Sequence, residues 1–168
     1  DLKQSFTVVL HHPVTSEADD AHMQMHHVIA GAWARSHQVL CLWPGQDAGA
    51  DQVSKAVRGW QSQIHTVRNL PPTRFLRLLT QCQVLVGNSS AGIRECSYLG
   101  VPVVNVGTRQ RGRERSQNVC DVEVSAADIA DAVTSQIAHG PYQPSQLYGE
   151  GNAGERIAEV VQEGSEVT

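Results

Sequence analysis

Short apolar runs alternate with longer segments of mixed polarity along the chain. The runs predict buried β-strands at residues 6–10, 39–43, 64–67, 84–86, 101–106 and 119–124. The segments between and after them predict helices from about 20 to 36 and at 51–61, 73–80, 90–100, 126–138 and 152–162. Strand and helix therefore alternate, which indicates right-handed β-α-β units and a parallel sheet.

The composition favours an α/β fold with three layers. Hydrophobic residues make up 40% of the 168 residues and aromatic residues only 5%, so small aliphatic side chains must fill most of the core. Such a core suits a Rossmann-like parallel sheet covered by helices. The length suits one domain over residues 1–168, without a repeat, and we expect residues 163–168 to form a frayed tail.

Charge and cysteine content exclude several classes of protein. The net charge of −4 argues against a general nucleic-acid binder, and no apolar run is long enough to span a bilayer. The four cysteines form no C-x-x-C pair, which makes a zinc site or a disulfide framework a poor interpretation. We therefore expect free thiols in a cytoplasmic protein that needs no membrane.

Polar side chains gather where the predicted strands end. Ligands of open parallel sheets bind outside the carboxyl ends of the strands. The candidates at that edge are His12, Asp47, Asn69, Ser89, Ser90 and the loop that begins at Gly107.

The turn after the fourth predicted strand has two interpretations. Ser89 and Ser90, followed by the small residues Ala91 and Gly92, could form a phosphate cradle from hydroxyls and backbone N–H groups. An ordinary helix N-cap is the alternative, and it needs only one serine. A hydrolase serine is not favoured, because the G-x-S-x-G motif requires glycine at position 91.

Charged residues near this turn point to an anionic ligand. Four arginines follow the fifth predicted strand in a chain that is otherwise acidic: Arg109, Arg111, Arg113 and Arg115. Guanidinium groups suit phosphate oxygens, although a solvated loop is the common alternative and at most two of the four can point inward. Glu95 could accept hydrogen bonds from a ribose diol, or be an exposed charge or a partner of Arg94.

Other motifs carry less weight. His12 could contact or protonate a phosphate, although a structural role is common for one of eight histidines. His22 and His26 have the spacing of a zinc site, but position 23 is Met where a zinc protease needs Glu. Residues 149–154 match G-x-G-x-x-G but follow no strand, so we interpret them as a turn. We expect neither a metal nor a cofactor.

Taken together, these motifs resemble the UDP-N-acetylglucosamine 2-epimerases, and most closely the hydrolysing branch. The matching segments are GNSSAGIRE at 87–95, GVPVVNVG at 100–107, TRQRGRE at 108–114, YGEGNA at 148–153, LHHPVT at 10–15 and WPGQDAG at 43–49. The resemblance covers nearly the whole chain but only the C-terminal half of such an enzyme. It implies one Rossmann-like domain of a two-domain GT-B arrangement, with the catalytic carboxylates in an absent N-terminal domain.

The resemblance also implies roles for individual residues. Ser89, Ser90 and Arg113 would bind the diphosphate, Glu95 the ribose hydroxyls, and Phe75 the uracil. His12 would lie near the leaving diphosphate, with His11 left open as the alternative. Gly92, Arg109 and Asn69 complete the expected UDP site by their positions.

The sequence thus predicts the UDP-binding domain of a hydrolysing UDP-N-acetylglucosamine 2-epimerase, which belongs to sialic-acid or surface-sugar synthesis. The expected partners are the UDP-sugar and the N-terminal domain, within a homo-oligomer when full length, and the domain alone should be inactive. Two alternatives remain. One is an epimerase that retains UDP, or a glycosyltransferase, on the same architecture. The other is a UDP-sugar sensor without catalysis.

Overall fold

Six parallel strands form one sheet in the order β3-β2-β1-β4-β5-β6. The computed structural model describes residues 4–45 and 47–165. The strands are β1 (Thr7–Val9), β2 (Val39–Leu42), β3 (His65–Val67), β4 (Val84–Gly87), β5 (Val103–Val106) and β6 (Val119–Val122). This is the Rossmann strand order, so the predicted α/β fold is confirmed.

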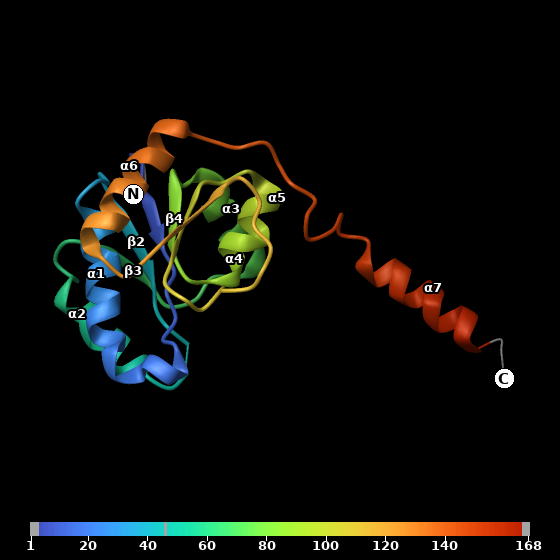
Figure 1. Cartoon of the computed structure of the whole chain (residues 1–168), viewed down its shortest axis with the longest axis horizontal. Coiled ribbons are helices and arrows are strands. Elements are labelled where there is room, and N and C mark those ends of the chain that lie inside the picture. The colour runs from blue at the N-terminus through green and yellow to red at the C-terminus, as the bar shows by residue number, and fades with distance from the viewer. Residues whose placement is uncertain (1–3, 46, 166–168) are drawn as a thin grey trace.

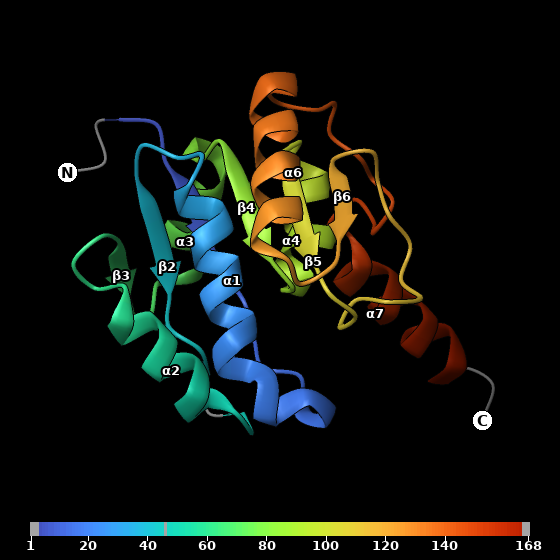
Figure 2. The ribbon, with the colours of Figure 1, turned by 60° about the vertical axis from the view of Figure 1, so that its left-hand side comes forward.

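The helices lie in two layers, one on each face of the sheet (Figures 1 and 2). The described helices are the 3-10 helix η1 (Thr15–Asp20), α1 (Ala21–Trp33), α2 (Ala50–Gly59), α3 (Pro72–Gln81), α4 (Ser90–Ile93), α5 (Glu95–Leu99), α6 (Ala126–His139) and α7 (Ala153–Ser165), of which α7 lies outside the two layers. Helices α1, α2 and α6 cover one face, and α3, α4 and α5 cover the other.

Alternation along each strand sends neighbouring side chains to opposite layers. Val9 and Val86 pack with Ile29 of α1 on one face, whereas Val8 and Leu85 pack toward α3 and α4 on the other. Both clusters consist mainly of aliphatic side chains, as the low aromatic content predicted. The sheet is therefore a middle layer buried on both sides, which fixes the points at which the loops of its carboxyl edge begin.

Two local predictions needed correction. The helix expected over 90–100 is two short helices, α4 and α5, which are separated at Arg94 (φ −97°, ψ −72°). Helix α7 continues to Ser165, three residues beyond the predicted end at 162, and residues 166–168 lie outside the described part, so the frayed tail stays a prediction.

The segment after α6 crosses the outer layer before α7 begins. The N–H of Tyr142 donates to the Gly100 carbonyl (2.8 Å), and the N–H of Ser145 donates to the Ser97 carbonyl (2.9 Å). Only glycine fits at position 100, because its φ is +69° and a Cβ would lie 2.2 Å from the Tyr142 carbonyl oxygen. The chain then leaves the body, and α7 stands apart from it (Figure 1).

Candidate functional site

Asn88 joins the carboxyl ends of β1 and β4. Its side chain is buried; its Oδ1 accepts from the N–H of His12 (2.7 Å), and its Nδ2 donates to the His12 carbonyl (2.8 Å). Gly87 allows this close approach, since a Cβ there would lie 2.1 Å from the Leu10 carbonyl oxygen. The edge of the sheet is therefore fixed where the sequence predicted a ligand site.

The loop after β5 is held to the same residue. We call residues 107–113 the arginine loop. Within it, Gln110 Nε2 donates to the Asn88 carbonyl (2.6 Å), and Arg109 Nη1 donates to the same oxygen (3.1 Å). Arg109 therefore lies at the predicted edge, beside the serine turn. Asn88 thus connects three segments that are far apart in the sequence.

The two serines of the turn differ in what their hydroxyls contact. Ser89 is the N-cap of α4, and its Oγ accepts from the N–H of Ala91 (3.3 Å). Ser90 Oγ has no hydrogen-bond partner within the described residues and is half-buried. A Cβ at Gly92 would lie 2.9 Å from Val103 Cγ1, so glycine there lets α4 pack closely on the sheet. Ser90 is therefore the hydroxyl available to a ligand.

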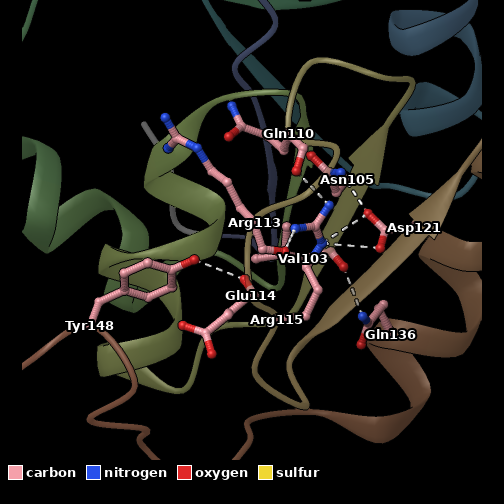
Figure 3. Close-up of polar contacts among 9 residues, drawn as sticks. All are labelled: Val103, Asn105, Gln110, Arg113, Glu114, Arg115, Asp121, Gln136 and Tyr148. Atoms are coloured by element: carbon pink, nitrogen blue, oxygen red, sulfur yellow. Dashed lines mark hydrogen bonds and ion pairs between the residues drawn. The ribbon is translucent and has the colours of Figure 1, made fainter.

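Arg113 and Arg115 have opposite environments (Figure 3). Arg115 Nε binds the Asp121 carboxylate (3.1 Å), and its guanidinium also donates to the backbone carbonyls of Gln110 and Arg113. The Arg113 guanidinium points away from this cluster and has no polar partner in the described part of the chain. Arg115 thus shapes the loop, and Arg113 remains available to an anion.

A hollow of about 420 Å³ lies between α3, α5 and the segment after α6. Leu76, Tyr98 and Tyr148 line it together with Glu95. Glu95 Oε2 is buried and has no hydrogen-bond partner among the described residues, so it can accept from a ligand. The Tyr148 hydroxyl donates to the Glu114 carbonyl (2.8 Å), which places the hollow beside the end of the arginine loop (Figure 3).

Two expected site residues lie elsewhere. Phe75 packs against the core between α3 and the sheet, and its neighbour Leu76 lines the hollow. Asn69 is exposed after β3, which is three strands from β4 in the sheet, or about 14 Å at the usual strand spacing. The structure therefore places His12, Ser90 and Arg109 at the carboxyl edge of the sheet and Glu95 at the hollow, and leaves Asn69 apart.

The two histidines at the end of β1 are distinguished by burial. His11 is 2% exposed, and neither ring nitrogen has a hydrogen-bond partner among the described residues, whereas His12 is half-buried at the edge. Burial, followed by the nearby His12 and Arg109, lowers the pKa of His11 to about 3. Burial and Arg109 also lower the pKa of His12, while Asp47 opposes this shift. Both rings are therefore neutral at neutral pH.

The described residues contain no group of three metal-ligating side chains suited to a metal ion. His26 Nδ1 accepts from the indole N–H of Trp60 (3.1 Å), and the two rings are in contact, so His26 packs against Trp60. Within the described part, the four cysteines are free thiols. No described helix combines the length and the hydrophobicity needed to cross a membrane.

Sequence reasoning missed several residues of this site. The sequence assigns no role to Asn88, Gln110 or Tyr148, which appear only within the matching segments, and it gives no signal for Tyr98. The position of Asn88 directly after a buried strand was the one available signal. Tyr98 and Tyr148 meet only because the segment after α6 folds back along α5.

Comparison with known proteins gives a consistent result. Residues 1–162 match the family model described as UDP-N-acetylglucosamine 2-epimerase. The chain is 31% identical, over 163 residues, to UDP-N,N'-diacetylbacillosamine 2-epimerase (hydrolyzing) of Legionella pneumophila, covering 96% of this chain and 43% of the relative. It therefore spans less than half the length of that protein.

Solved structures of similar fold include two epimerases. UDP-GlcNAc 2-epimerase of Neisseria meningitidis, bound to UDP-GlcNAc, superposes with a TM-score of 0.74 at 15% identity, over 95% of this chain and 45% of that one. The Methanocaldococcus jannaschii enzyme in complex with UDP-GlcNAc and UDP gives 0.74 at 14% identity, over 94% and 45%. The fold is thus confirmed as the predicted half of a GT-B-type enzyme.

Proposed function

This chain belongs to the UDP-N-acetylglucosamine 2-epimerase family, and we propose that it is the UDP-binding domain of a hydrolysing member. One observation carries the proposal. Within the described part of the chain, Ser90 Oγ and the Arg113 guanidinium have no hydrogen-bond partner, and Glu95 at the hollow presents a buried acceptor that also lacks one. Donors for phosphate and an acceptor for a diol are what a nucleoside diphosphate requires.

The proposed binding mode uses both parts of the site. Ser90, the turn of Ser89 and Gly92, Arg109 and Arg113 would surround the diphosphate, and Glu95 would accept from the ribose hydroxyls. Leu76, Tyr98 and Tyr148 would contact the uracil, with Phe75 supporting Leu76 from the core side. His12, whose backbone Asn88 fixes, would lie beside the leaving phosphate.

The proposed reaction is elimination of UDP followed by hydration. A base removes the proton at C2, the C1–O bond to UDP breaks, and the electron pair forms a C1=C2 double bond. Water then adds its hydroxyl to C1 and a proton to C2 from the opposite face, which gives free N-acetylmannosamine. The donors proposed here act on the charge that develops on the leaving phosphate, where such groups are most effective.

The proton-transfer groups would come from a second domain. This chain spans 43% of its Legionella relative, and helix α7 stands apart with Ile157 and Val160 exposed by 63% and 68%. An apolar helix face of this kind needs to be buried against another body. We propose that α7 packs on the N-terminal domain of the full-length enzyme.

The relative with 31% identity favours a second candidate substrate. Its name states that it hydrolyses UDP-N,N'-diacetylbacillosamine, a sugar nucleotide with a different sugar. The site described here holds the UDP part, which the two substrates share. We propose UDP-N-acetylglucosamine as the substrate, with a role in sialic-acid or related surface-sugar synthesis, and the bacillosamine compound as the alternative.

The test is product analysis with the full-length protein. Each UDP-sugar is incubated in deuterated water, and NMR follows free UDP and deuterium at C2 of the sugar. The proposal predicts release of UDP together with a free 2-epimeric sugar that carries deuterium at C2. A sugar that stays on UDP would indicate the epimerase that retains UDP, and UDP release without deuterium at C2 would indicate a transferase. No turnover despite UDP binding would favour the sensor.

A further inference from the structure

Glu17 connects the arginine loop to the helical layer below it. Glu17 lies in η1, and its Oε1 accepts from Thr108 Oγ1 (3.0 Å). Its other oxygen, Oε2, accepts from Gln24 Nε2 (2.7 Å). One carboxylate thus bridges two donors, one of which lies 91 residues away in the sequence.

The two hydrogen-bond donors to Glu17, Gln24 and Thr108, differ in how firmly the rest of the fold holds them. Gln24 is buried on α1, which packs directly on the sheet and cannot shift without disturbing the core. Thr108 belongs to an irregular loop whose shape the sheet does not determine. Because Gln24 holds one carboxylate oxygen of Glu17, the other oxygen holds Thr108 at a fixed place relative to α1.

Thr108 starts the turns that end at Arg113. The N–H of Arg111 donates to the Thr108 carbonyl (2.9 Å), and the N–H of Arg113 donates to the Gln110 carbonyl (3.3 Å). Thr108 is held by Glu17 at the start of the loop, Arg109 and Gln110 are held by the Asn88 carbonyl, and Arg115 donates to the Gln110 and Arg113 carbonyls. Glu17 is the partner of the side chain at the start of these turns. Removal of the contact with Glu17 would let the following turn rotate.

We infer that Glu17 is a positioning residue, which holds the arginine loop so that Arg113 meets the leaving phosphate of the UDP-sugar. The inference rests on the proposed function for its ligand, whereas the anchoring of the loop rests on the two hydrogen bonds alone. Glu17 itself would not contact the ligand, since a carboxylate beside a diphosphate is repelled. Bonds to an ionised carboxylate are stronger than neutral ones, which suits an anchor.

The test uses the full-length protein with a set of matched variants. Glu17→Ala removes both acceptors, Glu17→Gln retains one amide oxygen, and Thr108→Val removes the donor while keeping the shape. Asp131→Ala, an exposed carboxylate on α6, is the control. Amide hydrogen exchange of residues 108–113 is measured with kcat and KM for the UDP-sugar.

We expect Glu17→Ala to speed exchange in residues 108–113, to leave exchange in α6 unchanged, and to lower kcat about 10- to 100-fold with a smaller change in KM. Glu17→Gln should recover part of kcat. The double variant Glu17→Ala/Thr108→Val should be no worse than Glu17→Ala, because Glu17→Ala alone already removes the contact with Thr108. If Glu17 only stabilised the fold, Glu17→Ala would lower the melting temperature but would not lower kcat more than it changes KM.

Two results would overturn the inference. Unchanged exchange in residues 108–113 of Glu17→Ala would show that Glu17 does not hold the loop, whatever happens to activity. Faster exchange with an unchanged kcat would show that the position of the loop has no effect on the reaction. Failure of the proposed function is a separate outcome: the wild-type protein would neither bind UDP nor turn over, while the exchange data would still decide whether Glu17 is the anchor.

Discussion

The sheet edge around Asn88 and the C-terminal helix α7 are held in opposite ways. At the edge, a buried asparagine forms hydrogen bonds with His12, and its carbonyl accepts from Arg109 and Gln110. Helix α7 lies away from the body, with Ile157 and Val160 exposed (Figure 1). This chain alone therefore fixes the edge at which we propose phosphate binding, whereas α7 exposes an apolar face.

The difference has a physical basis in what each region must do. Donors that stabilise developing charge work best when their positions are fixed before the reaction, because no free energy is then spent on reorganisation. An isolated helix of about 12–15 residues is marginal in water and gains stability by packing its apolar face. The edge should thus be sensitive to substitution in any form of the protein, and α7 only where its partner is present.

The largest expected effect is on turnover at the edge. Arg113→Ala in the full-length enzyme should lower kcat about 100- to 1000-fold, since its guanidinium would stabilise the charge on the departing phosphate. Steady-state kinetics measure this, with Arg111→Ala, a nearby exposed arginine, as the matched control. Wild-type turnover in Arg113→Ala would remove Arg113 from the proposed mechanism.

The second largest effect is expected on the free energy of unfolding, which should fall after substitution at the sheet edge but not beside α7. Asn88→Ala leaves the backbone N–H and carbonyl of His12 without their partners, which should lower the free energy of unfolding of this chain by about 2–4 kcal/mol. Asn152→Ala, just before α7, should change it by less than about 0.5 kcal/mol. Urea denaturation of both variants measures the difference, and equal losses would contradict it.

A smaller effect is expected on the pH dependence of UDP binding, through the protonation of His12. The pKa of His12 is held below its usual value of 6.5 in the free protein, by burial and then by Arg109. A bound diphosphate would raise it, so binding should take up a proton, and UDP affinity should rise as pH falls through the bound-state pKa. Below the free-state pKa this gain should level off.

The size of this pH effect is bounded at about tenfold in affinity per pH unit. Protonation of UDP itself opposes it, so the measurement is the difference between wild type and His12→Gln in calorimetric titrations from pH 8 to about pH 5. Identical pH profiles for the two proteins would show that His12 does not titrate with the ligand.

The smallest effect is expected at α7 in this chain alone. Ile157→Ala should change the free energy of unfolding by less than about 0.5 kcal/mol, whereas Ile129→Ala, in the buried contact of α6 with α1, should cost about 2–5 kcal/mol. In the full-length protein, Ile157→Asp should lower the melting temperature. No change there would contradict the proposed packing of α7.

The sequence predicted the sheet well because its signals are local. The apolar run of β4 and the small residues after it identify a strand end, and the β-α-β rule then places His12 and Ser90 on one edge. Residue types alone do not distinguish Arg113 from Arg115, and only the resemblance to the epimerase family selected Arg113 for the phosphates. In the structure the difference between the two arginines comes from the ion pair of Arg115. That ion pair is made with Asp121 from β6, a contact formed only in the folded state.

Other features of the site could not be predicted because they too depend on contacts formed only in the folded chain. The two roles of Ser89 and Ser90 depend on which hydroxyl reaches the N–H of Ala91, a matter of backbone angles that residue types do not specify. The interruption at Arg94 and the fold-back that brings Tyr148 toward Tyr98 are likewise set by tertiary packing. Periodicity reports which side of an element is buried, but not which distant side chain it meets.

The most direct test of the account is calorimetric titration of this chain with UDP, UMP and uridine, in the wild type and in Glu95→Ala and Arg113→Ala. We predict saturable binding of UDP that weakens as phosphates are removed. Glu95→Ala should weaken all three ligands, and Arg113→Ala should weaken UDP while leaving uridine unchanged. Uridine binding as tight as UDP binding, or UDP binding unaffected in both variants, would contradict the assignment of this site.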